Sequence, residues 1–273
     1  MPLDEFGSPA DPSVCSVEMS SRVFSSLAPV RVTVAYATAL FVIASTLLAL
    51  GPRAQDRVVG ALSTNLHNLR HGHLGTLLGS AFVTAEGQTY LLLPGLICLL
   101  ALAELLWCSR RLIQAFALGH VGATLIVAAG LAAAIRFGWL PTSIAGASDV
   151  GLSYGAVAVV GTLTAAIPAR WRPAWISGGV TVAGVVLVAT YGSDFTAVGH
   201  TVALVLGMVL STRFPVRPDW TKLRLALLAV GVPFGLLLLV GVSLPSAPVA
   251  VPAGLAAASA AAIAVRFASH RFA

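Results

Sequence analysis

Long runs of apolar residues without a charge dominate the pattern along this chain. Residues 32–50 contain 19 positions without a charged side chain, and residues 89–103 contain 15 before Glu104. A helix needs about 20 apolar residues to cross the hydrocarbon core of a bilayer. The runs are continuously apolar rather than alternating, which argues against a membrane β-barrel. The pattern therefore predicts an all-α fold, a polytopic membrane helix bundle.

Eight apolar segments are predicted to be membrane spans. The first two are joined by a long loop, residues 51–88, in which leucines alternate with His and Asn, so we expect short helices at the outer membrane interface. Residues 1–30 contain four acidic side chains and no early apolar core, so we interpret them as a cytoplasmic disordered tail rather than a signal peptide. The eight segments are 32–50, 89–107, 112–135, 150–168, 174–192, 196–211, 223–244 and 247–267.

Composition supports the membrane assignment. The 273 residues are 58% hydrophobic and only 10% charged, whereas a soluble domain carries roughly 25% charged residues. The net charge of +6 comes largely from arginines in short loops, which membrane topology explains better than nucleic-acid binding. These loops lie on alternate faces, so we expect a multi-pass protein of the plasma membrane with both termini cytoplasmic. Abundant Ala, Val and Gly, with a single Lys, suggests a bacterial source.

Ser153 and His200 are the polar side chains most worth testing for chemistry, because polar groups inside a membrane are costly and usually functional. Ser153 follows Asp149 and Gly151 at the start of the fourth segment, and His200 follows Asp194 at the start of the sixth. We expect each Asp to cap its helix. Both segments run from outside to inside, so Ser153 and His200 are predicted to lie at similar depth. A serine beside a histidine is the minimum for nucleophilic acyl transfer.

Small residues on the same two segments predict close helix packing. Gly155 and Gly161 lie on the fourth segment, and Ala203 and Gly207 continue the face of His200 on the sixth. Small residues at steps of three and four let two backbones approach in a membrane. The ordinary alternative for the polar pair is structural, with Ser153 bonding its own helix and His200 satisfied by a neighbour.

The remaining histidines and cysteines have ordinary explanations. His67, His71 and His73 have a spacing that suits a metal on a helix, but no carboxylate or Cys lies nearby in sequence, so we interpret them as a polar interfacial face. His120 is expected to hydrogen-bond a neighbouring helix. The three cysteines do not form a disulfide framework. No metal and no cofactor is predicted.

Several short motifs resemble those of rhomboid intramembrane serine proteases. Gly151-Leu152-Ser153, with Gly161 eight residues after the serine, resembles the Gly-x-Ser-Gly helix of that family. Residues 200–207 resemble its His-x-x-Gly-Leu-x-x-x-Gly helix, with Ala203 at the first small position. Residues 104–111 resemble the end of its second span, and residues 77–83 resemble the approach to that span. The resemblance covers about residues 77–211.

The resemblance implies a division of the chain and roles for its residues. Residues 31–211 would form a rhomboid-like six-helix core, with 51–88 as an extracytoplasmic interfacial loop. Residues 212–273 would add about two transmembrane helices and a short cytoplasmic tail. Ser153 would be the nucleophile and His200 the general base, acting on transmembrane protein substrates within the lipid bilayer.

The chain also departs from the family pattern around the pair. The second span has neither the His nor the Asn that helps to hold the oxyanion in the family, so Gln88, Tyr90 and Gly151 are the candidates to shape that region. Tyr154 stands where the family prefers Gly. Val157 stands where many members have an aromatic residue that stacks on the histidine.

Three functions follow from these observations. The first is an intramembrane serine protease that uses Ser153 and His200. The second is a catalytically inactive rhomboid-like protein that binds membrane clients, which the altered surroundings of the pair favour. The third is a small transporter, against which stand the lack of an inverted repeat and of an acidic residue at mid-membrane.

Overall fold

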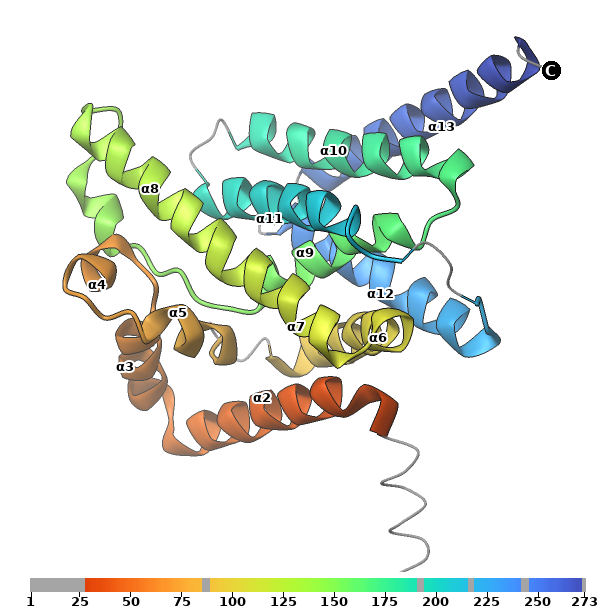
Figure 1. Cartoon of the computed structure of the whole chain (residues 1–273). Helices are drawn as coiled ribbons and strands as arrows, with labels where there is room; N and C mark the ends of the chain where they lie inside the picture. Colours follow the sequence, from red (N-terminus) through yellow and green to blue (C-terminus); the bar gives the residue numbers. More distant parts are fainter. Residues whose placement is uncertain (1–27, 85–88, 191–193, 216–218, 242–245, 272–273) are drawn as a thin grey trace, which may run out of the picture.

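The computed structural model (Figure 1) describes residues 28–84, 89–190, 194–215, 219–241 and 246–271, and in these ranges the chain is helical without a strand. Residues 1–27, most of the predicted tail, lie outside the described part, as does Gln88. The α-helices are α2 (Arg31–Leu50), α3 (Pro52–Leu62), α4 (Leu66–Arg70), α5 (Thr76–Gly79), α6 (Thr89–Trp107), α7 (Ser109–Ala117), α8 (Ala123–Arg136), α9 (Ser153–Thr162), α10 (Arg172–Ala189), α11 (Phe195–Ser211), α12 (Lys222–Val240) and α13 (Ala247–Arg271).

The fold class predicted from the sequence is confirmed. In the described residues, six helices are long and apolar enough to cross a membrane, and two shorter apolar helices, Ser153–Ala165 and Phe195–Ser211, accompany them. The protein is therefore a multi-pass membrane protein. The loop 51–88 contains short helices, as expected: α3, α4, α5 and a 3-10 turn, Ser80–Phe82.

The two short helices lie inside the bundle. Every residue of α9 after Ser153 is buried, whereas α13 buries few of its residues. A helix that is surrounded by other helices has no contact with lipid to satisfy, so it need not match the thickness of the hydrocarbon core. One prediction is wrong here: α9 is preceded by Leu152 without a side-chain cap, so Asp149 is not its N-cap. The prediction for Asp194 is confirmed, since its carboxylate accepts a hydrogen bond from the Thr196 amide.

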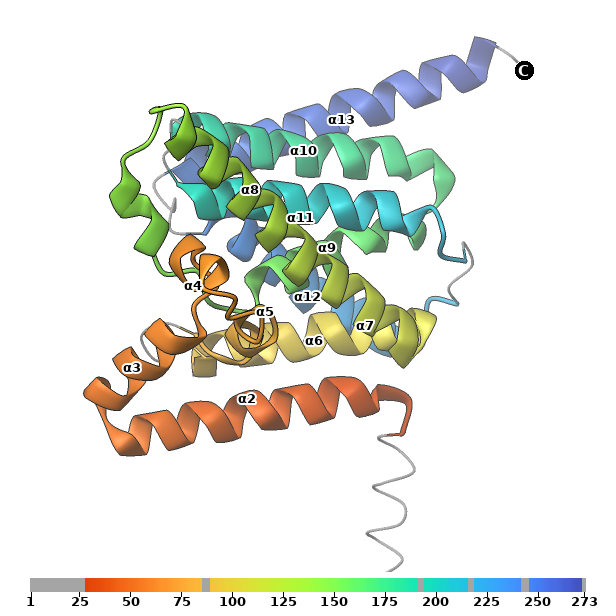
Figure 2. The same cartoon turned by 60° about the vertical axis from the view of Figure 1, so that its left-hand side comes forward.

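The helices are stacked in layers across the bundle. Figure 2 shows α2 at one edge, followed by α6, then α9 with α12, then α11 and α10, with α13 at the opposite edge. Helix α8 crosses the face of this stack, and α3, α4 and α5 gather at the end of the bundle where α9 and α11 begin. Helix α2 begins on the side of the bundle where α13 ends. The start of α2 and the end of α13 on one side of the bundle agree with an even number of membrane crossings.

Glycines allow α9 to touch its neighbours backbone to backbone. A methyl group on Gly161 would overlap the carbonyl oxygen of Leu204 and lie 3.0 Å from the Cα of Gly207 on α11. A methyl group on Gly207 would in turn overlap the carbonyl of Ala158. Without a hydrophobic driving force between helices in lipid, such close contact is a main source of helix association. The small-residue stripe predicted on the sixth segment thus forms the contact between α9 and α11.

The C-terminal helices are built into the bundle. Helix α12 packs on α6 and also contacts α9, α10 and α11, while α13 packs along α10. A methyl group on Gly231 would lie 3.0 Å from the Cα of Leu99, so α12 and α6 are in backbone contact. At the start of α12, Arg224 donates to the carbonyl of Leu105 at 2.7 Å.

Glu104 joins three helices at the end of the bundle where α2 begins. Its carboxylate accepts hydrogen bonds from the amides of Val32 and Thr33 at 3.0 and 2.9 Å, from the Thr33 hydroxyl at 2.7 Å and from the Ser109 hydroxyl at 2.6 Å. The first amides of a helix have no partner within the helix, and an acidic group near them is stabilising. Glu104 therefore caps α2 from α6, and Ser109 of the motif in residues 104–111 completes its set of donors.

Candidate functional site

The segment before α9 is held by the long loop. The Asp149 carbonyl accepts from the Thr64 amide at 2.9 Å and from the Thr64 hydroxyl at 3.0 Å, and the Asp149 amide donates to the Ser63 hydroxyl at 2.9 Å. Two residues later, the Gly151 amide donates to the Ser80 carbonyl at 2.9 Å. Gly151 has φ +123°, a conformation that favours glycine because it lacks a Cβ. The loop therefore sets the position at which α9, and with it Ser153, begins.

Ser80 and His120 form a buried polar pair beneath this segment. Their Oγ and Nε2 atoms are 3.1 Å apart, Ser80 is fully buried and His120 is 5% exposed. His120 lies in a π-helical turn, Leu118–Gly122, between α7 and α8. Single π-helical turns within α-helices often occur at functional sites. The predicted partner of His120 was a neighbouring helix, and the structure instead pairs it with the turn that follows α5.

Ser153 and His200 lie on adjacent helices near the same end of the bundle. Ser153 is the first residue of α9 and is partly exposed, and His200 lies in the second turn of α11 and is 6% exposed. Among the described residues, the buried Nε2 atom of His200 has no hydrogen-bond partner, so none joins it to the Ser153 hydroxyl.

Tyr154 occupies the position next to His200. Its ring packs edge-to-face on the imidazole, with centroids 5.4 Å apart and planes at 85°. A methyl group on Gly199 would overlap the Tyr154 ring, so the tyrosine also lies directly on the backbone of α11. Tyr154 is therefore the side chain in the first turn of α9 that packs directly against α11.

Tyr154 also supplies the aromatic contact that Val157 lacks. Many family members are expected to place an aromatic residue four positions after the serine, where this chain has the buried Val157. Here the ring against His200 comes from the position directly after the serine. The tyrosine hydroxyl is buried and has no hydrogen-bond partner. An unpaired buried hydroxyl is unfavourable, which marks this contact as one made at a cost.

The end of α12 lies behind His200. A methyl group on Gly241 would lie 3.6 Å from Cε1 and 3.7 Å from Nδ1 of the imidazole. Tyr154 and Gly241 therefore both lie close to the ring. The sequence did not predict this contact, because the resemblance ends before α12.

The other predicted site residues make packing contacts of their own. Tyr90 contacts α2, with its hydroxyl 2.9 Å from that of Ser45 and its ring against Phe41. Gly155 packs against the ring of Phe116, and Ala203 is fully buried on α11. The structure therefore places Tyr154 against His200, with Gly151 and Ser153 just before Tyr154 in the chain, and uses Gly155, Gly161, Ala203 and Gly207 for packing.

The three histidines of the long loop lie next to one another with their rings tilted. The rings of His67 and His71 are 4.4 Å apart, and those of His71 and His73 are 6.4 Å apart. The Nδ1 atom of His71 lies 2.7 Å from the carbonyl oxygen of His67. Within the described residues, no group of three or more His, Cys, Asp or Glu side chains is placed to hold a metal ion.

Asp149 is the titratable group nearest to the start of α9. Burial raises the pKa of its carboxyl to about 6. A carboxyl with such a pKa is only partly ionised near pH 6. The loop that positions Ser153 therefore contains a group that titrates in a mildly acidic range.

Comparison with known proteins gives one match. The family described as rhomboid-like protein matches residues 27–216, which is well over half of the chain. No curated protein and no solved structure matches the chain. The matched region contains Ser153 and His200 and ends before α12.

Proposed function

Because the chain belongs to the rhomboid-like family, we propose that it binds transmembrane segments of client proteins in the bilayer without cleaving them. The observation that supports this proposal is the packing of Tyr154 on His200, which leaves the imidazole Nε2 buried and without a partner. A general base must lie within hydrogen-bond reach of the proton that it removes. The lack of a described hydrogen-bond partner at Nε2 of His200 supports this proposal.

The lack of oxyanion-binding side chains in the second span also supports binding without cleavage. The second span, now α6, has no His or Asn in its first turns, and Tyr90 is engaged with Ser45 of α2. Removing a single oxyanion donor typically costs about 10²–10³ in rate. A serine without a paired base and without those donors is a weak nucleophile.

A second candidate function is intramembrane serine proteolysis. Ser153 is partly exposed at the first turn of α9, and His200 lies on the helix that touches α9 most closely. Hydrogen bonds of a catalytic pair are often long or poorly aligned before substrate binds. In this alternative, a client helix displaces Tyr154, Ser153 attacks the scissile carbonyl and His200 takes the serine proton. His200 then gives that proton to the amine that leaves as the peptide bond breaks, and water hydrolyses the acyl-enzyme.

Labelling with a fluorophosphonate separates the two functions. We expect the folded protein to give no more signal than its Ser153→Ala variant. Tyr154→Gly restores the residue that the family prefers and serves as a test of whether the tyrosine is what blocks reaction. Strong labelling of the unmodified protein that disappears in Ser153→Ala would overturn the proposal and establish the protease.

Client binding needs its own measurement. Photo-crosslinking in membranes should capture the same transmembrane proteins with the wild type and with Ser153→Ala, because binding does not use the serine hydroxyl. Capture of intact clients by both proteins supports binding without cleavage. Client fragments that appear only with the wild type would contradict it.

A further inference from the structure

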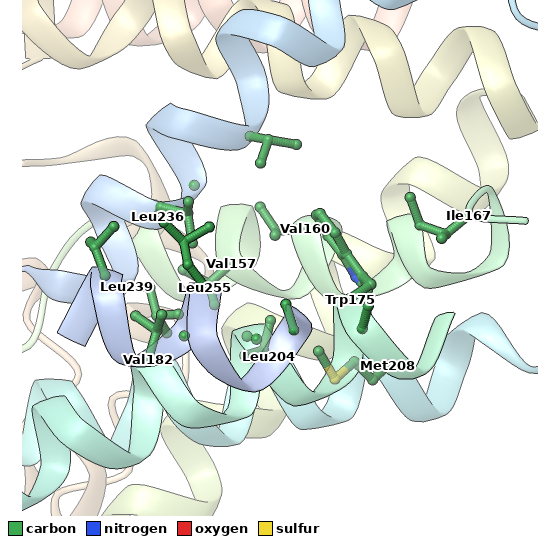
Figure 3. A pocket seen from close by; sticks show the side chains of 18 of the residues that line it. Val157, Val160, Ile167, Trp175, Val182, Leu204, Met208, Leu236, Leu239 and Leu255 are labelled. Atoms are coloured by element: carbon green, nitrogen blue, oxygen red, sulfur yellow. The ribbon is translucent and has the colours of Figure 1, made fainter. Parts of the chain in front are cut away.

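An apolar cavity lies among five helices, and neither Ser153 nor His200 lines it. Its volume is about 340 Å³, and its walls come from α9, α10, α11, α12 and α13. Figure 3 shows Val160, Leu204, Leu236 and Leu255 converging on it from four of these helices, with Trp175 of α10 beside them. The two C-terminal helices form one wall, so the cavity exists only because α12 and α13 are present.

The dimensions of the cavity suit a single alkyl chain. Along α10 it extends from Trp171 to Val182, which at 1.5 Å per residue is about 16 Å. A helix with its side chains is about 10–12 Å across, so 16 Å of helix occupies more than about 1,000 Å³. The cavity of about 340 Å³ is therefore too small for a client helix, whereas a narrow, flexible alkyl chain can enter it.

Positive charge gathers at one end of the cavity. The guanidinium of Arg266 on α13 lies 5.9 Å from the ring centre of Trp171, and Arg170 is the exposed neighbour of that tryptophan. Arg172 turns inward instead and donates to the carbonyls of Ile167 and Ala165. Basic side chains next to an aromatic residue at the end of a membrane helix are suited to the phosphate of a lipid.

A polar donor lies within the wall near this end. The indole N–H of Trp175 is buried and has no hydrogen-bond partner. Trp175 is one helical turn from Trp171, which is about 6 Å along α10. The ester carbonyl of a glycerophospholipid lies at a similar remove from its phosphate, so it can reach the indole when the phosphate is beside Trp171.

We propose that this cavity binds one acyl chain of an anionic glycerophospholipid, with the phosphate beside Arg170 and Arg266. The alkyl chain runs between α10 and α12 toward Val182. The lipid links α13 to the rest of the bundle by filling the space that side chains leave open. This inference does not depend on whether Ser153 is catalytic.

Native mass spectrometry of the purified full chain tests the lipid site. The probes are phosphatidylglycerol and phosphatidylcholine with the same acyl chains, and inorganic phosphate as a headgroup without a chain. We expect one phosphatidylglycerol to remain bound at least tenfold more than phosphatidylcholine, and inorganic phosphate not to compete. Equal retention of the two lipids, or displacement by phosphate alone, would overturn the proposal.

Two substitutions that fill the cavity test whether the lipid binds there. Ala174→Phe on α10 and Val251→Trp on α13 each place a ring in the cavity, and Val251 is 37% exposed, so its replacement has room to adjust. Each should reduce retained phosphatidylglycerol at least tenfold. Ile176→Phe is the matched control, because Ile176 lies on α10 outside the cavity lining and is 39% exposed.

A charge variant tests the headgroup contact separately. Arg170→Gln combined with Arg266→Gln should remove the preference for phosphatidylglycerol while leaving chain binding in place. Retention by the cavity-filling variants equal to that of Ile176→Phe would show that the lipid binds elsewhere on the surface. Helical circular dichroism of every variant establishes that the protein remains folded.

Discussion

Two buried polar atoms at the candidate site, the Tyr154 hydroxyl and Nε2 of His200, have no hydrogen-bond partner. Burying such groups unpaired costs free energy, so their presence needs a reason. A serine hydroxyl or water beside Nε2 would remove part of this cost. Tyr154 instead fills the adjacent space with its ring. We therefore expect the residue after Ser153 to influence whether the pair can form a hydrogen bond.

The pKa of Asp149 leads to a prediction on pH. Because burial raises this pKa to about 6 from an ordinary value near 4, the folded protein binds more protons than the unfolded chain between those values. The contribution of Asp149 to the free energy of unfolding is then greatest below pH 4 and falls as the pH rises through 6. Relative to Asp149→Asn, the wild type should lose melting temperature from pH 4 to pH 7. Parallel melting curves for the two proteins would contradict this account.

Glu104 carries a second prediction for a single residue. Glu104→Gln replaces one acceptor oxygen by an NH₂ group that faces donors on Val32, Thr33 or Ser109. Loss of hydrogen bonds to a charged group costs about 2–3 kcal/mol, so we expect a clear fall in the free energy of unfolding. Arg110→Gln, at an exposed position nearby, should change it little. Equal effects of the two substitutions would show that Glu104 does not hold α2 in place.

Pairs of helices in this protein pack closely where one of them has a glycine, which has no side chain, at the contact. Gly161 meets the backbone of α11, and Gly231 meets the backbone of α6. A side chain at either position would separate two helices that are in van der Waals contact. The central helix α9 is buried along almost its whole length, so it depends on these contacts more than the lipid-facing helices do.

Substitution of Gly161 tests this dependence. Gly161→Leu should cost about 3 kcal/mol or more, because the new side chain meets backbone atoms that cannot move aside. Gly130→Leu is the matched control, since a methyl group there would meet nothing within 4 Å on the exposed face of α8. Thermal unfolding in the same detergent measures both. A Gly130→Leu variant as unstable as Gly161→Leu would point to a general effect of added bulk.

At the scale of the whole molecule, the residues before and after a long helical stretch lie at opposite ends of the bundle. Cys108 follows α6 and is exposed, whereas Ser143 is exposed in the turn after α8. The helical stretch between them, residues 109–136, is about 42 Å long at 1.5 Å per residue, which exceeds the hydrocarbon thickness. The arginine pattern predicts that Cys108 faces the cytoplasm.

Thiol labelling tests that orientation. In a protein whose Cys15 and Cys98 are replaced by Ser, a membrane-impermeant maleimide should label Cys108 only after cells are permeabilised. A Ser143→Cys variant that also carries Cys108→Ser should be labelled in intact cells. The reverse pattern would show that the protein has the opposite orientation and that the loop arginines do not set it.

Much of the fold was predictable, because a continuous apolar run has few ways to satisfy its backbone in lipid. The eight apolar segments correspond to α2, α6, the α7–α8 stretch, α9, α10, α11, α12 and α13. Ser153 and His200 were also correctly placed on neighbouring helices. The partners of Ser80, His120 and Glu104 were not predictable, because each contact joins residues that are far apart in the chain.

The sequence by itself determined that this protein is a helical membrane bundle, because hydrophobic run length and loop charge act locally and do not depend on how helices meet. Only the tertiary structure decided what surrounds Ser153 and His200. The direction of Tyr154 follows from which face of α9 meets α11, and that face is set by Gly161, Gly199 and Gly207 together. The same packing leaves an apolar cavity beside α12 and α13, which the spacing of residues along the chain does not reveal.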